Sequence, residues 1–200
     1  MAEPTMIRDY TEDDRPAIEA CFRELQQFER GLDSNRVAAE LISAPYLDWL
    51  LLQCRTKRGK VFVAEADERV VAFLSVYIEL HLTGMLSDIT DFAYISDLIV
   101  SEQYRRQGVG TALLATAEAY AAGAGASHVV LRVLTANEAA IAAYRRFGFA
   151  EHNVRMIKSV RQVRSARAGL PVPATGAGAP RCSRAQPAQR VPRSRPAPRV

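Results

Sequence analysis

The chain has 200 residues, 48% of them hydrophobic, which is enough for one well-buried domain with a tail. Its net charge of +4 is the sum of two unlike segments. Residues 1–160 have 17 basic and 22 acidic side chains, whereas residues 161–200 have nine arginines and no acid. The three cysteines have neither a paired nor a metal-binding spacing, which argues against a disulfide scaffold and a zinc site. The sequence also has no secretory pattern, and it has no apolar run long enough for a membrane span. We therefore expect a soluble, cytoplasmic protein.

The N-terminal half predicts a strand, then helices, then a hairpin. The first helix has one apolar stripe that recurs every three or four positions, formed by Ile18, Phe22, Leu25 and Phe28. Pro45 is expected to end a second helix and begin a third helical segment. The pattern then changes to two β-strands around a polar turn. The predicted elements are a strand over 5–10, helices over 11–30, 34–44 and 45–57, and a hairpin over 60–80 with its turn at 66–69.

The C-terminal half predicts further strands and helices up to about position 160. The helix after the glycine-rich turn has Leu113, Leu114, Ala117 and Tyr120 on its buried side. Asn137 is a natural N-cap for the next helix. The predicted elements are a loop over 81–91, a strand over 92–100, helices over 111–126 and 137–147, a β-rich run over 127–135, and one or two closing strands over 148–160.

The composition divides the chain into a domain over 1–160 and a tail over 161–200. The tail is rich in Arg, Pro, Ala, Gly and Ser and has no aromatic residue. Such a segment buries too little apolar surface to offset the entropy of ordering, so we expect it to be disordered.

A basic, glycine-rich turn joins the strand over 92–100 to the following helix. Backbone N–H groups at a helix start lack intrahelical partners and attract phosphate. Gly108 and Gly110 remove the Cβ atoms that would keep a diphosphate from those amides, and Arg105 and Arg106 add positive charge. The dinucleotide fingerprint requires a third glycine where Leu113 stands, and the P-loop Gly-Lys-Ser/Thr is absent. The turn therefore predicts a pyrophosphate site of another kind.

Two signatures resemble those of the GNAT superfamily of N-acetyltransferases. Arg105, Gly108 and Gly110 fill the three specified positions of the superfamily's acyl-CoA motif, Arg/Gln-x-x-Gly-x-Gly/Ala. The second signature is Asn-x-x-Ala-x-x-x-Tyr-x-x-x-Gly-Phe, matched by Asn137, Ala140, Tyr144, Gly148 and Phe149. The resemblance covers roughly residues 5 to 159.

This resemblance implies an α/β fold with a mixed central sheet, splayed between its fourth and fifth strands and flanked by helices. Acetyl-CoA would be the co-substrate and no metal would be needed. Strand main chain would bind the pantetheine arm, and backbone amides of the turn would bind the pyrophosphate. The implied cofactor-binding residues are Leu98, Ile99, Val100, Arg105, Arg106, Gln107, Gly108, Val109, Gly110, Thr111 and Asn137.

The implied chemistry is acetyl transfer from a thioester to an amine. Tyr144 would face the sulfur and donate a proton to the leaving thiolate, since a free tyrosine has a pKa of about 10. Asp97, in the middle of its strand, is the first candidate for the base that removes the amine proton. Asp91, Glu79 and His81 are further candidates near the strand ends or in the loop.

Each of these residues also has a structural interpretation. The two glycines fit any helix start, and the two arginines fit a solvated surface. Tyr144 lies on an apolar helix face and fits a packed core, Asn137 fits a simple helix cap, and Asp97 fits a strand residue hydrogen-bonded to a loop.

The acceptor is not specified by these motifs. The negative charge of residues 1–160 favours a cationic acceptor, and Tyr46, Trp49 and Tyr94 are candidates for lining its pocket, with a core position as the alternative for Trp49. The resemblance allows a homodimer, although no sequence feature marks an interface.

Two other functions fit parts of the sequence. One is a non-catalytic acyl-CoA-binding or sensing module, which would not need Tyr144. The other is binding of nucleic acid through the basic tail, against which the lack of interleaved aromatic residues argues. A low-complexity tail without a role is the simpler interpretation.

Overall fold

Five strands form one mixed sheet in the unit that extends to His152. The computed structural model describes residues 5–80 and 91–158. In chain order the elements are β1 (Met6–Asp9), η1 (Glu12–Asp14), α1 (Arg15–Leu32), α2 (Ala39–Thr56), β2 (Lys60–Ala66), β3 (Arg69–Leu80), β4 (Asp91–Val100), η2 (Glu102–Tyr104), α3 (Val109–Gly123), β5 (His128–Leu131) and α4 (Glu138–Phe147). The predicted mixed α/β fold is confirmed.

The sheet has the order β1-β2-β3-β4-β5, and only the last pair of strands is parallel. A parallel pair needs a crossover connection, which here contains α3. The pairing of β4 with β5 ends at Ile95 and Leu131, although β4 continues to Val100. β5 itself ends at Leu131, and a cleft lies between the unpaired part of β4 and the segment that follows β5, in agreement with the predicted splay.

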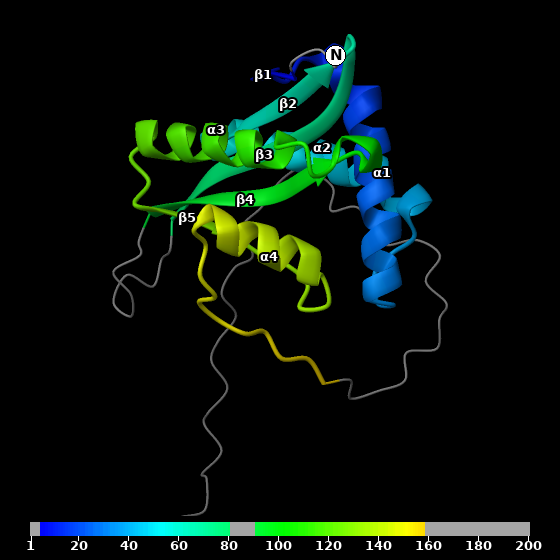
Figure 1. Cartoon of the computed structure of the whole chain (residues 1–200), viewed down its shortest axis with the longest axis vertical. Helices are drawn as coiled ribbons and strands as arrows, with labels where there is room; N and C mark the ends of the chain where they lie inside the picture. Colours follow the sequence, from blue (N-terminus) through cyan, green and yellow to red (C-terminus); the bar gives the residue numbers. More distant parts are fainter. Residues whose placement is uncertain (1–4, 81–90, 159–200) are drawn as a thin grey trace, which may run out of the picture. The chain divides into compact units, whose positions relative to one another are not determined.

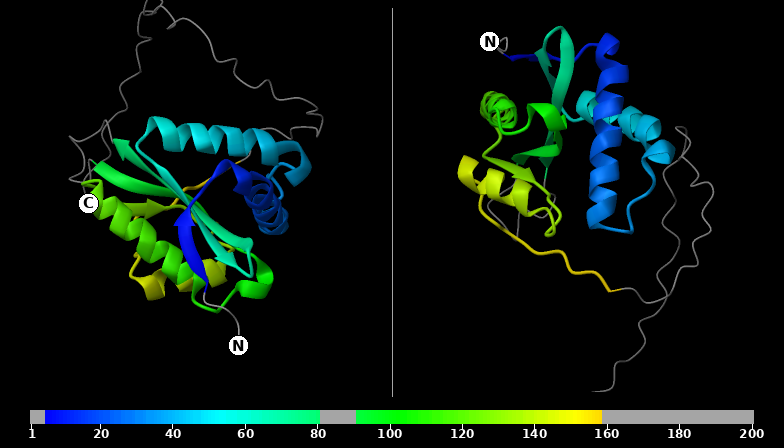
Figure 2. Two further views of the ribbon diagram at one scale, coloured as in Figure 1. Left: turned by 90° about the horizontal axis from the view of Figure 1, so that it is seen from above. Right: turned by 45° about the vertical axis from the view of Figure 1, so that its right-hand side comes forward.

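Helices cover both faces of the sheet (Figure 1). The view from above in Figure 2 shows α1 and α2 on one side of the sheet and α3 and α4 on the other. The buried side chains divide in the same way: Leu47 and Phe73 belong to the cluster under α1 and α2, whereas Leu74 and Leu113 belong to the cluster under α3. Burial on both faces explains why β2 and β3 are almost continuously apolar.

The turn between β2 and β3 is as tight as the sequence predicted. Asp67 and Glu68 join the paired residues Ala66 and Arg69, and their φ angles are 49° and 57°. Positive φ at both central residues is typical of a type I′ turn, whose twist matches that of the flanking strands.

The prediction that Pro45 separates two helices is wrong, because α2 is one helix that contains Pro45. Proline removes one hydrogen bond from a helix interior. Side chains on both sides of Pro45 are nevertheless buried, and they hold the two halves in line. The buried residues of α2 are Ala39, Ser43, Leu47, Leu50 and Cys54.

Two further predictions of apolar burial are wrong. Phe28 is 44% exposed on α1, where Gln26 is buried instead and donates to the carbonyl of Val37 at 2.9 Å. The described part of the predicted closing segment, residues 148–158, contains no strand, and Met156 is 91% exposed. An extended segment becomes a strand only through inter-strand hydrogen bonds, and the described sheet consists of β1 to β5.

Several predictions fall on residues outside the described ranges. These are the loop over 81–90, which contains His81, and the tail over 161–200. The domain boundary near position 160 stays a prediction. None of the described helices is long and apolar enough to cross a membrane.

Candidate functional site

Asp97 lies next to a β-bulge in β4. The pairing register shifts between Ser75 and Val76 of β3, so that Ser96 is an extra residue on β4. Successive side chains of a strand point to opposite faces, and one extra residue therefore changes the face on which the next side chain lies. The bulge places Asp97 on the face covered by α1 and α2, where it meets Tyr46 of α2.

The Asp97 carboxylate is buried and hydrogen-bonded. Its Oδ2 accepts from the Tyr46 hydroxyl at 2.9 Å and from the Ser75 hydroxyl at 3.1 Å, and the residue is only 7% exposed. Burial raises the pKa of Asp97, and hydrogen bonds from Tyr46, Ser96 and Ser75 offset this in part. A carboxyl group with a raised pKa is a better base near neutral pH than a fully solvated one.

A cleft of about 480 Å³ opens between α1, α2, the splayed part of the sheet and α4. It gathers residues that are far apart in sequence and that carry charge, hydroxyl or amide groups. Its polar and charged lining includes Glu29, Arg36, Tyr46, Asp97, Arg132, Asn137 and Tyr144.

Tyr144 faces this cleft from α4, which begins at the cap residue Asn137. Its ring packs edge-on against Phe149 with the ring centroids 5.8 Å apart. Burial raises the pKa of Tyr144 to about 12, with smaller contributions from the charges of Glu29 and Asp97. The phenol therefore keeps its proton throughout the neutral range, as a proton donor must, although donation is less favourable than from a free tyrosine.

Glu29 of α1 is a cleft residue that the sequence analysis missed. Its side chain is 16% exposed, and its Oε2 is 2.6 Å from a guanidinium nitrogen of Arg36. Burial raises the pKa of Glu29, and the charge of Arg36 opposes this. No motif marks Glu29, because it reaches the cleft only through the packing of α1 against the sheet.

The predicted pyrophosphate turn has the geometry of an anion site. None of the backbone N–H groups from Gln107 to Thr111, a range that includes Val109, donates a hydrogen bond to another described residue. Gly108 is left-handed with φ 88°, and Arg106 before it also has a positive φ of 61°. A Cβ on Gly110 would meet only Val100, at 3.6 Å. Free amides around an open glycine surface fit a diphosphate.

The two arginines of the turn have different environments. Arg105 is tied to the protein, with its Nε donating to the Val100 carbonyl at 2.8 Å and a terminal nitrogen 2.8 Å from Glu24. Arg106 is exposed and has no ion pair within the described ranges. Arg105 therefore shapes the turn, and Arg106 has the freer charge.

The other implied cofactor residues lie along the splay. Leu98, Ile99 and Val100 pair with β3 and not with β5, so the opposite edge of this segment faces the opening. The Asn137 side chain caps α4 by accepting from the Ala140 N–H at 3.2 Å, and it also lines the cleft. Both interpretations of Asn137 are compatible with this arrangement.

The remaining candidates are divided between the cleft and the surface. Tyr46 and Tyr94 line the cleft. Trp49 does not line it and is 44% exposed, with its ring next to that of Tyr46, so Trp49 is neither a pocket residue nor a core residue. Glu79 is paired with Lys57 at 2.8 Å, and Asp91 is an exposed residue at the start of β4. Neither lines the cleft.

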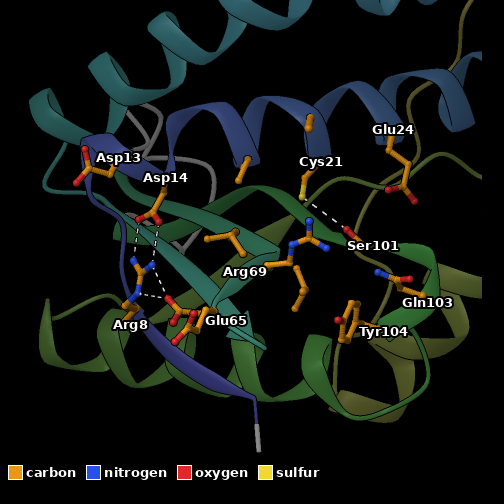
Figure 3. A pocket seen from close by; sticks show the side chains of 15 residues that line it. Arg8, Asp13, Asp14, Cys21, Glu24, Glu65, Arg69, Ser101, Gln103 and Tyr104 are labelled. Carbon is orange, nitrogen blue, oxygen red and sulfur yellow. Dashed lines mark hydrogen bonds and ion pairs between the residues drawn. The ribbon is translucent and has the colours of Figure 1, made fainter. Parts of the chain in front are cut away.

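A second cavity, of about 520 Å³, lies between α1, the β2–β3 hairpin and the segment after β4 (Figure 3). Here Arg8 bridges Asp14 at 2.7 Å and Glu65 at 2.6 Å. The charged side chains of the lining are mostly acidic, with Asp13, Asp14, Glu24, Glu65 and Glu68 against Arg8 and Arg69. Five of the 22 acids of residues 1–160 thus line a cavity that shares no residue with the cleft.

The splayed mixed sheet, its cleft and the turn of free amides after β4 define a domain of the acetyltransferase type. The comparison with known families agrees. The sequence model of the Acetyltransferase (GNAT) family matches residues 18–149, and the chain belongs to this family. The described residues contain no group of three or more His, Cys, Asp or Glu side chains suited to a metal ion.

Curated relatives are N-acetyltransferases from distant organisms. An N-alpha-acetyltransferase of Sulfurisphaera tokodaii is 38% identical over 96 residues, which cover 46% of this chain and 58% of the relative. A thialysine N-epsilon-acetyltransferase of Mus musculus is 27% identical over 150 residues, covering 72% of this chain and 83% of the relative. The chain thus spans less than two thirds of the archaeal relative.

Solved structures share the fold at low sequence identity. Glucosamine-6-phosphate N-acetyltransferase from Arabidopsis thaliana superposes with a TM-score of 0.56 at 18% identity, over 80% of this chain and all of that one. An aminoglycoside acetyltransferase from an uncultured soil metagenomic sample gives 0.57 at 22% identity, over 78% and 97% of the two chains. At these identities the likeness supports the fold alone.

Proposed function

We propose that this protein is an N-acetyltransferase that transfers the acetyl group of acetyl-CoA to a primary amine by direct transfer within a ternary complex. The observation that carries the proposal is the cleft in which Tyr144 and Asp97 lie at the splay of β4 and β5, with the turn of free amides after β4. Acetyl-CoA supplies an activated acetyl thioester.

The turn and the splayed strand would hold the co-substrate. The amides from Gln107 to Thr111 bind the pyrophosphate, and Arg106 adds charge that no described acid neutralises. The free edge of Leu98 to Val100 offers peptide groups to the pantetheine arm. Fixing both reactants in one cleft lowers the entropic barrier to their reaction.

Tyr144 and Asp97 would handle the protons. The acceptor nitrogen forms a bond to the acetyl carbon as the bond from that carbon to sulfur breaks. Tyr144 donates its proton to the departing thiolate, and Asp97 accepts the proton lost by the amine, directly or through water. The raised pKa of Asp97 brings its proton affinity closer to that required at neutral pH.

We also propose a reducing, cytoplasmic location for this activity. Cys21 and Cys54 are buried and unpaired, and burial raises the pKa of the Cys54 thiol to about 12, which keeps it unreactive. Assembly as a homodimer stays a prediction.

The test is a panel of primary amines with acetyl-CoA, in which release of free thiol is followed for the wild-type chain and for Tyr144→Phe. We expect the variant to lower kcat by at least about tenfold with a nearly unchanged dissociation constant for acetyl-CoA. Equal turnover of the two proteins would remove Tyr144 from the mechanism. Acetyl-CoA binding without thiol release from any amine would favour a non-catalytic sensing module.

The binding half of the proposal needs its own variant. Gly110→Leu places a bulky side chain where diphosphate would approach the amides, while within the chain only Val100 lies near. We expect calorimetry to give an affinity for acetyl-CoA at least about tenfold weaker. Gly123→Leu, at the other end of α3 with nothing within 4 Å, is the matched control and should retain affinity. Full affinity in Gly110→Leu would place the cofactor elsewhere.

A further inference from the structure

The candidate cleft contains charges of both signs. Its acids are Glu29 and Asp97, and its bases are Arg36 and Arg132. This balance differs from the net negative charge of residues 1–160, because most of the acids in that range do not line the cleft. The charge of the whole domain is therefore a poor guide to the acceptor, and the individual cleft residues are a better one.

Three of these four charges already have partners. Arg36 and Glu29 form an ion pair of 2.6 Å, in which both side chains are at most 36% exposed. The Asp97 carboxylate accepts hydrogen bonds from Tyr46 and Ser75. Arg132 is different: no acid forms an ion pair with it among residues 5–80 and 91–158.

Arg132 is held at the mouth of the splay. It directly follows Leu131, the last residue of β5 that pairs with β4. Its guanidinium carbon lies 5.6 Å from the ring centroid of Tyr94, a cation–π arrangement, and the Tyr94 ring in turn packs 5.5 Å from that of Tyr77. Aromatic contact positions the guanidinium while leaving its N–H groups available.

We propose that the acceptor is an amine that also carries an anionic group, a carboxylate or a phosphate, and that Arg132 binds this group. This proposal rests on the proposed acetyltransferase function. A guanidinium presents a planar fork of donors that matches the oxygens of either anion. We expect the anion to be held at Arg132 while the amine lies near Tyr144 and Asp97, so that different residues of the same cleft bind the two groups of the acceptor.

The experiment compares acceptors that differ only in the anion. L-lysine against L-lysinamide tests a carboxylate, and glucosamine 6-phosphate against glucosamine tests a phosphate. We expect the wild-type protein to favour the anionic member of at least one pair by about tenfold or more in kcat/KM. The pair that shows the preference identifies the anion.

Variants assign the preference to Arg132. Arg132→Gln should remove most of it, and Arg132→Lys should retain a part because the charge remains without the planar fork. Arg146→Gln is the matched control: Arg146 is an exposed arginine of α4 that does not line the cleft, and its replacement should leave the preference intact. An anion preference that survives in Arg132→Gln, or no preference in either wild-type pair, overturns the proposal.

Equilibrium binding separates this proposal from the proposed function. The same four compounds are titrated by calorimetry into wild-type and Arg132→Gln protein in the presence of coenzyme A. Anion-dependent binding that is lost in the variant supports the role of Arg132 even if no acetyl transfer occurs. Transfer only to the neutral amines or to peptide N-termini, or binding of none of the four compounds, overturns it.

Discussion

The pKa of Asp97 depends on its burial and on the hydroxyl groups around it. Burial disfavours its charged form, and each hydroxyl that donates to it favours that form. The hydroxyl of Tyr46, at 2.9 Å from Oδ2, is the first of these donors. A residue of α2 thus lowers the pKa of the proposed base, against the larger effect of burial.

Tyr46→Phe should therefore raise the pKa of Asp97 further. We expect the acid limb of the kcat/KM pH profile to move up by about one pH unit, because loss of one hydrogen bond to a charged group destabilises the carboxylate by that order. Tyr10→Phe, which removes a hydroxyl bonded to Glu12 outside the cleft, is the control and should not move the limb. An unmoved limb in Tyr46→Phe would mean that Asp97 is not the titrating base.

Asp14 shows the opposite shift and predicts a loss of stability in acid. A hydrogen bond from Arg8 lowers the pKa of Asp14 from 3.8 to about 2. Because the folded value lies below the unfolded one, this stabilisation is present above about pH 4 and is lost as the pH falls towards 2.

Urea unfolding of Asp14→Asn measures this contribution. At pH 7 we expect the free energy of unfolding to fall by about 2 kcal/mol, and below about pH 3 the difference from wild type should shrink. Asp13→Asn, a change at the exposed neighbouring residue, should have little effect at either pH. A pH-independent difference would contradict the assignment to the Arg8 pair.

At the scale of elements, the junction between α2 and β2 has no free space. An added Cβ on Gly59 would lie 2.7 Å from the Cα of Cys54, from the Cβ of Tyr77 and from the carbonyl oxygen of Val76. The junction fixes the C-terminal end of α2 against β3, and thereby helps to place Tyr46 against Asp97.

Gly59→Ala should destabilise the fold by about 1–3 kcal/mol, because the added methyl group forces backbone to move. Gly31→Ala is the contrasting variant: Gly31 is inside α1 with nothing within 4 Å, and alanine should stabilise that helix by up to about 1 kcal/mol. Chemical denaturation of both variants tests the pair. Equal stability of Gly59→Ala and wild type would show that the junction adapts.

At the scale of the whole molecule, the formal charge of +4 hides an uneven distribution. The nine arginines after position 160 offset the acidic excess of the preceding residues. Every residue assigned here to the cleft or to the pyrophosphate turn lies before Asn153. Catalysis and the basic tail should therefore be separable.

Replacing all nine tail arginines by serine in the full chain should leave kcat/KM and the affinity for acetyl-CoA within about twofold of the wild-type values. Any dependence of this difference on salt concentration should also stay within about twofold. Gel-shift measurements at several salt concentrations test in parallel whether the wild-type chain binds nucleic acid. A tenfold loss of transfer in the variant would give the tail a catalytic role.

The sequence by itself determined the features that depend on neighbouring residues. These are the glycine turn, the Asn137 cap and the position of Tyr144 on the helix that Asn137 caps. Each follows from local geometry, which acts over a few residues and is visible as a fixed spacing in the sequence. The tertiary structure decided the rest. The bulge at Ser96 turned Asp97 towards α2, and long-range packing kept α2 continuous across Pro45. The splay of β4 from β5 brought Glu29 and Arg132 to one cleft. These outcomes depend on contacts between distant segments, which no local pattern encodes.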